Sequence, residues 1–489
     1  MSLSGSEQML ALLVLPLVCA ILLSLAGKSA NLRDGITLVT SLLVAAVAWS
    51  FGLGVADGSM PALVLAEPLP GLELGFRAEP LGAIFVLVAG TLWPIASLYS
   101  IGYMRGNNEG NQTRFFACFA ISISATMGVA LAQNLFSLFV FYEVLTLATY
   151  PLVAHHGDEE SKRGAKIYLV MLLSTSIGLL LTAILWTHAI AGHGEFEVGG
   201  LLAGKVEGPL VGVLLALYAF GIGKAALMPL HAWLPSAMVA PTPVSALLHA
   251  VAVVKAGVFC VIKVVVYVFG LDLLSAEPSA SWLAWVAGAS ILIASAIALR
   301  QDNLKRRLAF STVSQLAYVT MAAALVAPLS IMAAAIHIVA HAFGKITLFF
   351  AAGAIYTAAH KTNVSQMDGI GRKMPWTMGA FAIASLSMIG LPPTVGFVSK
   401  WYLLSGAIQA QADFAIAVLI LSTLLNAGYF LPILYRAFTK PVAEDASGHT
   451  HGEAPKTMVW ALSATALVTI VLFFAPDWPV GLATQLVGG

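Results

Sequence analysis

The sequence predicts an all-α polytopic membrane protein with about 14 transmembrane helices. Hydrophobic residues make up 59% of the 489 residues and charged residues only 10%, whereas soluble globular proteins contain roughly 25% charged residues. Apolar windows of about 20 residues, long enough to cross a bilayer, recur from one end of the chain to the other. Because charged residues are so few, each Lys and Arg can be assigned either to a loop or to a predicted span.

The predicted spans follow one another with short connections. Glu7, and no basic residue, precedes the first span, so we expect a retained helix rather than a cleaved signal peptide. The spans lie near 8–26, 35–56, 79–102, 115–132, 134–154, 167–187, 209–235, 243–269, 281–299, 308–326, 330–357, 375–410, 414–435 and 457–475.

Two of these spans are interrupted at corresponding places. Pro229 and Pro235 break one, and Pro392 and Pro393 break the other. Each is the fourth helix of a five-helix set, and an odd number of spans turns the second set upside down, so we predict two inverted repeats with an ion site at the membrane midplane. The predicted divisions are an N-terminal three-helix segment at 1–112, repeats at 113–270 and 271–440, and a polar linker with the C-terminal helix at 441–489.

The distribution of Lys and Arg predicts the orientation. Seventeen of these 24 residues, Lys28 among them, fall in loops on one side of the predicted membrane, and only Arg77 and Lys205 fall on the other. Positively charged loops stay in the cytoplasm, so we expect a multi-pass protein of the cell inner (cytoplasmic) membrane with both termini outside. The other five residues lie within predicted spans: Lys224, Lys255, Lys263, Lys345 and Lys400.

Composition argues against several functions. The net charge of +1 gives no basic surface for nucleic acid. The three cysteines lie in apolar runs without metal-ligand spacing, and no nucleotide, haem or iron–sulfur motif is found, so we expect no cofactor and no redox chemistry in this chain. His449 and His451 lie in the polar linker, where we expect solvated side chains and no metal site.

Glu143 is the sole acid deep within a span. A carboxylate there costs several kcal/mol unless it is neutral or paired. Lys224, which follows Gly221 and Gly223 in a span where helices can approach closely, is its best partner. We predict that this pair handles protons; the alternative is a buried structural ion pair.

The next span carries His249, Lys255 and Lys263. On a regular helix His249 and Lys255 lie about 120° apart, so they are expected to serve successive steps of a relay. Lys263 lies about two turns further on, where we expect its amine to reach the membrane interface.

His337, His341 and Lys345 repeat every four residues in IHIVAHAFGKITLFF. They therefore form a line on one helix face, with neighbours about 6 Å apart, which predicts a hydrated proton path. A metal pair is disfavoured because no acid or cysteine accompanies them. Lys400 follows the second break, whose freed carbonyls are available to water or a cation, and is expected to connect the path to solvent.

Four segments give the sequence a family resemblance. LMPLHAWLPSAMVAPTPVSALLHA, HIVAHAFGKITLFFAAG, GLPPTVGFVSKW and FRAEPLGAIF resemble signature segments of the antiporter-like subunits shared by respiratory complex I and the multi-subunit Mrp cation/proton antiporters. The resemblance covers nearly the whole chain and is strongest to the Mrp D-type subunit.

The resemblance implies a function and partners. Glu143 and Lys224 would be the interacting pair, His249 and Lys255 the central relay, and Lys400 the terminal lysine; the line from His337 to Lys345 would be the second half-path. The chain is expected to move protons within a Na⁺/H⁺ antiporter beside other membrane subunits in the lipid bilayer. The alternative is the proton-pumping subunit of an NADH-quinone oxidoreductase or of a related hydrogenase or carbon-uptake complex, with the chemistry in other chains.

Overall fold

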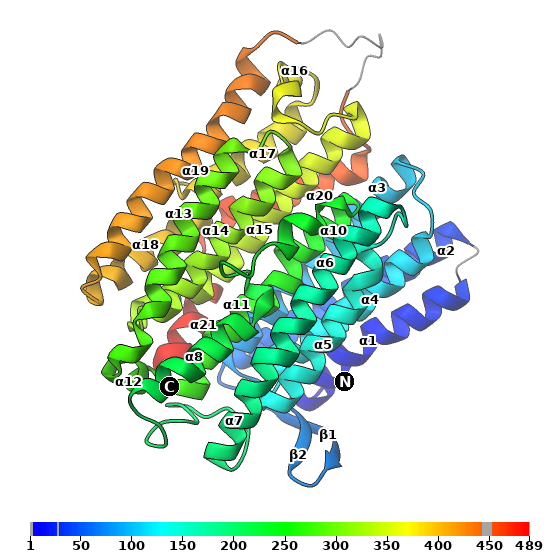
Figure 1. The fold of residues 1–489 in the computed structure, drawn as a ribbon. Coiled ribbons are helices and arrows are strands. Elements are labelled where there is room, and N and C mark those ends of the chain that lie inside the picture. Colours follow the sequence, from blue (N-terminus) through cyan, green and yellow to red (C-terminus); the bar gives the residue numbers. More distant parts are fainter. Residues whose placement is uncertain (1–2, 27–28, 443–451, 489) are drawn as a thin grey trace.

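Long helices running side by side make up the fold, as Figure 1 shows for this computed structural model. The structure describes residues 3–26, 29–442 and 452–488; Lys28, His449 and His451 lie outside this part. The N-terminal elements are α1 (Gly5–Ala26), α2 (Ala30–Ala56), β1 (Ala62–Leu69), β2 (Leu72–Arg77), α3 (Pro80–Gly106), α4 (Gln112–Leu131) and α5 (Leu135–Val153).

The middle of the chain is more irregular. α6 (Glu159–Thr175) continues through a π-helical turn, η1 (Ser176–Leu180), into α7 (Leu181–Ala191). The elements that follow are α8 (Pro209–Gly221), η2 (Gly223–Ala225), α9 (Trp233–Ser236), η3 (Ala237–Val239), α10 (Thr242–Ala246), η4 (Leu247–Val251), α11 (Val253–Lys263), η5 (Val264–Phe269), α12 (Leu271–Ala276) and η6 (Pro278–Ala280).

Longer helices return in the last part. They are α13 (Trp282–Arg300), α14 (Leu304–Ala324), α15 (Pro328–Ala359), α17 (Pro375–Ile389), α18 (Val395–Gln409), α19 (Asp413–Thr439), α20 (Lys456–Phe474) and α21 (Asp477–Gly488), with the short turns η7 (Val364–Gln366) and α16 (Ile370–Lys373) after α15. Eleven helices in the described ranges are long and apolar enough to cross a membrane. The predicted total of about 14 and the inverted repeats stay predictions.

Two stretches sit at the centre of the bundle and carry most of the ionisable residues. The most apolar 18-residue windows of α15 and of residues 242–269 are entirely buried, whereas those of α1 and α2 are 39% and 33% buried. α15 packs against α14, α17, α18, α20 and α3, and also against α10, η4 and α11. The polar side chains of α15 and α11 therefore face protein, and the apolar surfaces of α1 and α2 are left at the edge of the bundle.

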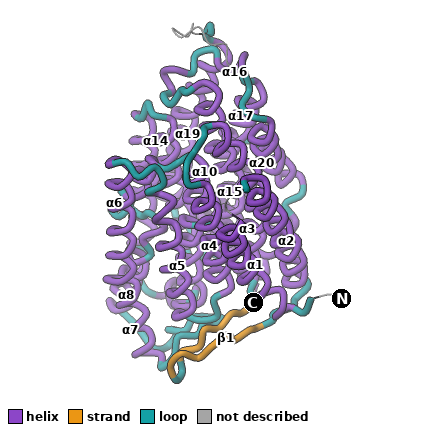
Figure 2. Tube along the Cα trace, turned by 90° about the vertical axis from the view of Figure 1, so that its right-hand side faces the viewer, coloured by secondary structure: helices purple, strands orange, loops and turns teal. Residues whose placement is uncertain are grey.

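One end of the bundle holds both termini (Figure 1). A two-stranded antiparallel hairpin projects beyond the helices at this end (Figure 2), with Leu63 opposite Phe76. Gln485 of α21 donates a hydrogen bond to the carbonyl of Ala56 at the end of α2 (2.8 Å). The 57–78 connection thus forms a paired hairpin, in which Ala62 lies opposite Arg77 and Leu69 opposite Leu72. Neither α21 nor the π turns were predicted.

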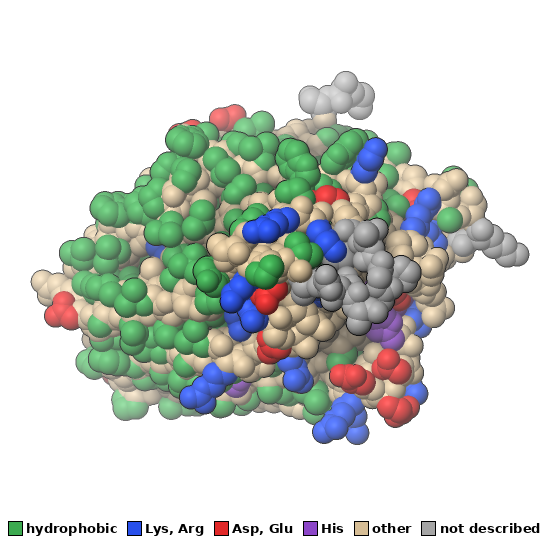
Figure 3. Space-filling view, turned by 90° about the horizontal axis from the view of Figure 1, so that it is seen from above, with side chains coloured by type: hydrophobic (Ala, Val, Ile, Leu, Met, Phe, Trp, Pro, Cys, Tyr) green, Lys and Arg blue, Asp and Glu red, His purple; other side chains and the backbone are tan. Residues whose placement is uncertain are grey.

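The opposite end, where α16 lies, carries charged side chains that gather over part of the surface, while hydrophobic side chains cover its flank (Figure 3). Arg372 and Lys373 end α16. Which side of a membrane this end meets stays a prediction.

Candidate proton-transfer site

Lys224 lies inside the first helix break with its side chain fully buried. Its ε-amino group donates to the main-chain carbonyl of Tyr142 (2.8 Å) and to Thr146 Oγ1 (2.6 Å). The same group lies 3.2 Å from the centre of the Tyr142 ring. The hydroxyl of Tyr142 accepts from the main-chain N–H of Lys224 (3.1 Å), which the break leaves without a helical partner. One aromatic residue of α5 thus holds both the backbone and the cation of Lys224.

The break begins earlier than the prolines indicate. α8 ends at Gly221, before Lys224, so the break starts on the N-terminal side of the lysine and not after it; Pro229 lies in the non-helical segment that follows, and Pro235 lies in the short helix α9. The segment is tightly packed at this point: a Cβ on Gly221 would overlap the main chain of Leu180, and one on Gly223 would overlap the Thr175 hydroxyl. Helix α8 therefore reaches the π turn η1 at a point where only glycine fits.

Glu143 follows Tyr142 on α5 but does not touch Lys224. Its carboxylate oxygens are both buried, and neither has a hydrogen-bond partner within the described part of the chain. The residues are close, since Lys224 bonds to the carbonyl of the preceding residue. Glu143 and Lys224 are therefore close to each other but do not form the direct ion pair that was predicted. A proton can pass between them only through a bridging water molecule or after one side chain changes its rotamer.

Lys255 connects two sets of residues that were predicted as separate parts of the route, the central relay and the second half-path. Its Nζ is in direct hydrogen-bond contact with Nδ1 of His341, across the boundary between α11 and α15. Both side chains are buried, and Nε2 of His341 has no partner among the described residues. The predicted central relay and the predicted second half-path therefore meet at one hydrogen bond.

His249 lies on the π turn η4, with its ring 4.7 Å from that of Phe349. The ring is fully buried, and within the described residues neither nitrogen has a hydrogen-bond partner. The angle of about 120° from Lys255 does not apply, because the π turn and the bend at Ala252 separate the two residues. A buried imidazole without partners is poised to bind water or a proton from a moving neighbour.

His337 occupies a hydrogen-bonded position one turn before His341. Its Nε2 lies 2.9 Å from Oε1 of Gln315, and its Nδ1 lies 2.9 Å from the hydroxyl of Ser399. An amide oxygen only accepts, so Nε2 carries a hydrogen. The Ser399 hydroxyl also lies 3.0 Å from the carbonyl of Gly396. When it donates to Nδ1 the ring is neutral, and when it donates to Gly396 the ring must donate through Nδ1 and is an imidazolium.

Lys345 ends the line on α15 and opens a second polar chain. Its Nζ donates to Ser311 Oγ (2.8 Å), which lies 3.0 Å from the hydroxyl of Tyr429. That hydroxyl donates in turn to Oδ1 of Asn426. The amide of Asn426 lies 3.4 Å from the carbonyl of Met388, near the end of α17. The chain therefore runs from α15 through α14 and α19 toward the second helix break.

Lys400 stands at that break. α17 ends at Ile389 and α18 begins at Val395, so Lys400 follows the break, as predicted. Its Nζ donates to the freed carbonyl of Ile389 (2.8 Å) and lies 5.0 Å from the ring centre of Tyr318. A groove of about 300 Å³ between α18 and α19 is lined by Lys400, Thr423 and apolar side chains. The ammonium of Lys400 thus hydrogen-bonds to a carbonyl that the break frees.

Several polar residues of this network are uncharged and were not identified from the sequence. Each sits in an apolar helix, so a search for hydroxyl and amide groups in the spans would have found them: Tyr142, Thr146, Ser311, Gln315, Ser399, Asn426 and Tyr429.

Lys263 requires a correction. Its side chain is fully buried and forms an ion pair with Glu79, the residue before α3. The expectation that its amine extends outward to the membrane interface was wrong, because the Glu79 carboxylate and the carbonyl of Ala132 hold the amine in a fully buried position. The described residues contain no group of three or more His, Cys, Asp or Glu side chains placed to hold a metal ion.

Charged groups outside the spans gather at the end that carries α16. Glu109 lies 3.8 Å from His155 and 3.5 Å from His156. Burial raises the pKa of Glu109. Burial, aided by the nearby His156 and Arg114, lowers the pKa of His155 to about 4. A cavity of about 220 Å³ beside them is lined by Tyr103, Lys305 and other residues.

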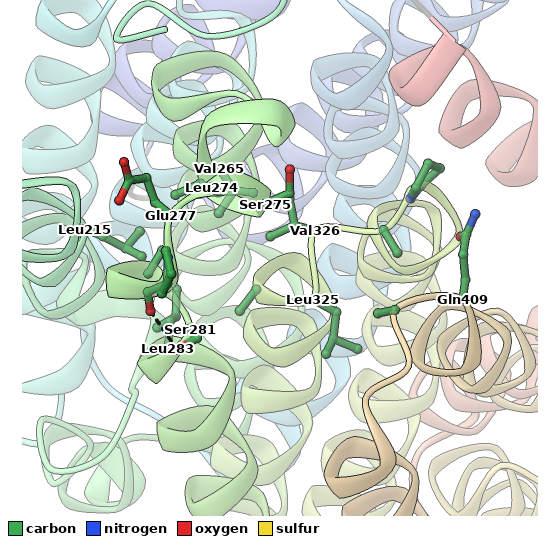
Figure 4. A pocket seen from close by; sticks show the side chains of 16 residues that line it. Leu215, Val265, Leu274, Ser275, Glu277, Ser281, Leu283, Leu325, Val326 and Gln409 are labelled. Carbon is green, nitrogen blue, oxygen red and sulfur yellow. Dashed lines mark hydrogen bonds between the residues drawn. The ribbon is translucent and has the colours of Figure 1, made fainter. Parts of the chain in front are cut away.

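A different pocket, of about 520 Å³, lies between α12, the α14–α15 connection and the end of α18 (Figure 4). Leu215, Glu277, Val326 and Gln409 are among its lining residues, and the eight predicted proton-transfer residues are not. Of these eight residues, Lys400 borders the groove between α18 and α19, and the candidate site is mainly a line of buried polar groups between the two breaks.

Known proteins are similar to this chain over most of its length. The family described as "NADH:quinone oxidoreductase/Mrp antiporter, TM" matches residues 132–426. NADH-quinone oxidoreductase subunit N of Desulforudis audaxviator is 35% identical over 422 residues, which cover 85% of this chain and 80% of that protein. A probable K(+)/H(+) antiporter subunit of Rhizobium meliloti is 30% identical over 425 residues, 85% of this chain but only 41% of that protein.

Solved structures share the fold. A chain of the Mrp complex from Dietzia sp. DQ12-45-1b superposes with a TM-score of 0.85 at 21% identity, over 99% of this chain and 97% of that one. A chain of the membrane-bound sulfane sulfur reductase, an archaeal respiratory membrane complex, gives 0.84 at 23% identity, over 98% and 97%. At such identities the likeness concerns the fold alone.

Proposed function

Because this chain belongs to the NADH:quinone oxidoreductase/Mrp antiporter membrane-subunit family, we propose that it is the proton-translocating subunit of a multi-subunit Na⁺/H⁺ antiporter. It is a multi-pass integral membrane protein with relatives in both kinds of assembly, and the coupling of proton movement to Na⁺ is what the experiment below tests. We place it in the cytoplasmic membrane with both termini outside, and we retain the proposed inverted repeats at 113–270 and 271–440.

The observation that carries the proposal is the contact between Lys255 and His341 at the centre of the bundle. An ion pair could serve stability, but a lysine against an imidazole adds no opposite charge and costs desolvation of both groups. Lysine and histidine are side chains that can change protonation inside a protein. A buried contact of this kind is useful where one proton is shared and passed on.

The route that we propose links the buried ionisable residues that lie between the two helix breaks, and one of its steps, from Lys255 to His341, is a direct hydrogen bond. Protons move between Glu143 and Lys224 at the first break, along His249, Lys255 and His341 in the centre, and through His337 and Lys345 toward Lys400 at the second break. The hydroxyl of Ser399 can accommodate either protonation state of His337, because it can donate to the ring or accept from it. Each group can accept and release a proton, and no cofactor is required in this scheme.

The test uses the whole assembly reconstituted in vesicles. Imposed Na⁺, K⁺ or electrical gradients are applied one at a time, and the internal pH is followed. The antiporter proposal expects proton movement coupled to Na⁺ and independent of any electron donor. Proton movement that occurs only with NADH and a quinone would instead establish the second candidate, a complex I-like pump, which the 35% identity to subunit N favours.

A partner requirement follows from the same proposal. The relatives are named as subunits of larger assemblies, and Lys400 faces a lateral groove. We expect the purified chain by itself to show little antiport, because the cation route lies in another chain. Robust antiport by this purified chain would refute that division.

A further inference from the structure

We propose that Glu79 and Lys263 form a second proton-relay pair, which connects the buried line of lysines to a water-filled cavity at the end of the bundle that holds both termini. This inference rests on the proposed proton-translocating function. It concerns two residues that the route from Glu143 to Lys400 does not use.

A large cavity lies beside Glu79 at this end of the bundle. It has a volume of about 1070 Å³, and its walls come from the hairpin end, the 195–199 connection, η5, α12 and α21. Arg77, Glu79, Glu197, Tyr267 and Asp272 are among the lining residues. The wall is largely apolar but contains these charged side chains, and a space of this size has room for many water molecules beside them. Glu79 therefore stands at the boundary between water and the interior of the bundle.

The ion pair spans that boundary. Lys263 is fully buried, while the Glu79 side chain keeps 9% of its surface exposed. The ammonium of Lys263 also donates to the carbonyl of Ala132 (2.7 Å) and lies 4.3 Å from the ring centre of Phe196, another residue of the cavity wall. One member of the pair faces the cavity and the other faces the protein.

Helix α11 carries the connection inward. Gly257 of α11 packs against the main chain of Lys224, where a Cβ would meet its carbonyl. Lys263 follows six residues later, which is about 9 Å along the helix axis. Lys255 lies on the other side of this contact, two residues before it. One helix thus places Lys263 in series with the lysines of the proposed route.

The choice of lysine distinguishes this pair from a purely structural one. Near the opposite end, Arg33 pairs with Asp34 (2.8 Å), and both side chains are 7% exposed. Arginine stays charged in proteins, whereas a buried lysine can lose its proton. A pair that only stabilises the fold needs no exchangeable proton, and apolar residues would often stabilise as well.

Each transfer in this pair moves one proton. A proton from cavity water binds the Glu79 carboxylate, and the carboxylic acid then passes it to the neutral amine of Lys263. This leaves the carboxylate and the ammonium as the observed ion pair. Lys263 then releases the proton inward to the neutral amine of Lys224, whose main chain packs against Gly257 of the same helix, and returns to the amine; the reverse order moves a proton out.

The first experiment compares Lys263→Arg and Glu79→Gln with the matched control Arg33→Lys, each in the whole assembly in vesicles. We expect Lys263→Arg and Glu79→Gln to lower proton transport at least tenfold in assembled complexes, and Arg33→Lys to stay within twofold of wild type. Wild-type-like transport by Lys263→Arg would overturn the proposal. An assembly whose wild type moves no protons would refute the proposed function instead.

A second measurement does not depend on the fold tolerating those variants. Tyr267 lines the cavity and its ring centre lies 6.0 Å from Nζ of Lys263. In Tyr267→Cys, a charged, membrane-impermeant thiol reagent should label the new cysteine from one face of the membrane and place a fixed positive charge beside the pair. We expect labelling and at least a fivefold loss of transport, with wild type unaffected. Complete labelling without loss of transport, or no labelling from either face, would overturn the proposal.

Discussion

Gly257→Ala offers a sharp test of how the structure positions Lys224. Gly257 faces the broken segment after α8, and an added Cβ would lie 2.6 Å from the carbonyl oxygen of Lys224. It would lie closer still to the carbonyl carbon of Lys224 and to the main-chain nitrogen of Ala225. These are backbone atoms, so no flexible side chain can move aside.

The magnitude follows from the overlap. Carbon contacts are favourable near 3.5–4.0 Å, so the segment with Lys224 must move by roughly 1 Å. Overpacking of this kind costs about 1–3 kcal/mol, against a gain of about 1 kcal/mol because Ala favours a helix more than Gly does. We expect a net loss of up to about 2 kcal/mol. A misplacement of about 1 Å at a reacting group can lower a rate by about 10²-fold, so transport should fall more than stability.

The assay is proton transport per assembled complex in vesicles, together with thermal unfolding of the purified complex. Gly379→Ala is the matched control, since it lies on helix α17 with no atom within 4 Å of its new Cβ. It should keep transport and unfold at the same or a slightly higher temperature. Equal transport and equal unfolding temperatures for the two alanine variants would refute the reasoning that Gly257 holds Lys224 in place.

Three further predictions use the same preparations. Glu143→Gln and Lys224→Ala should each abolish proton transport in complexes that still assemble, since each removes one member of a neighbouring pair; retention of most activity in both would mark a structural role. Lys400→Arg keeps the charge beside the Ile389 carbonyl but cannot release a proton, so it should transport as poorly as Lys400→Ala between pH 6 and 9, and near-normal transport would show that charge alone suffices there. His155, with a pKa lowered to about 4, stays neutral in the fold between pH 4 and 6.5, where an unfolded histidine binds a proton; stability should fall by up to about 3 kcal/mol as the pH drops through this window, and unfolding curves of His155→Gln that keep the full pH dependence would contradict this assignment.

The sequence by itself was enough to predict that the protein lies in a membrane, that it is all-helical, and which of its ionisable residues are buried in the spans. Hydrophobic runs of bilayer length are a local property of the chain, so nearly every expected span has a helix at its place. A lysine or glutamate in such a run needs protein around it, whatever the topology. That reasoning identified Lys224, Lys255, Lys345 and Lys400 as buried groups, and the structure places all four in the interior or at a break.

Only the tertiary structure decided which groups meet. The contact of Lys255 with His341 joins residues 86 positions apart, and no helical spacing predicts a partner on another helix. Tyr142 was not predicted from the sequence as part of the site, and neither were the π turns, because the hydropathy of a span hardly changes with one hydroxyl group or with a local widening of the helix. Lys263 looked like an interfacial lysine because its partner, Glu79, lies 184 positions away. Periodicity fixes the face on which a side chain lies, whereas the packing of distant helices determines what that face touches.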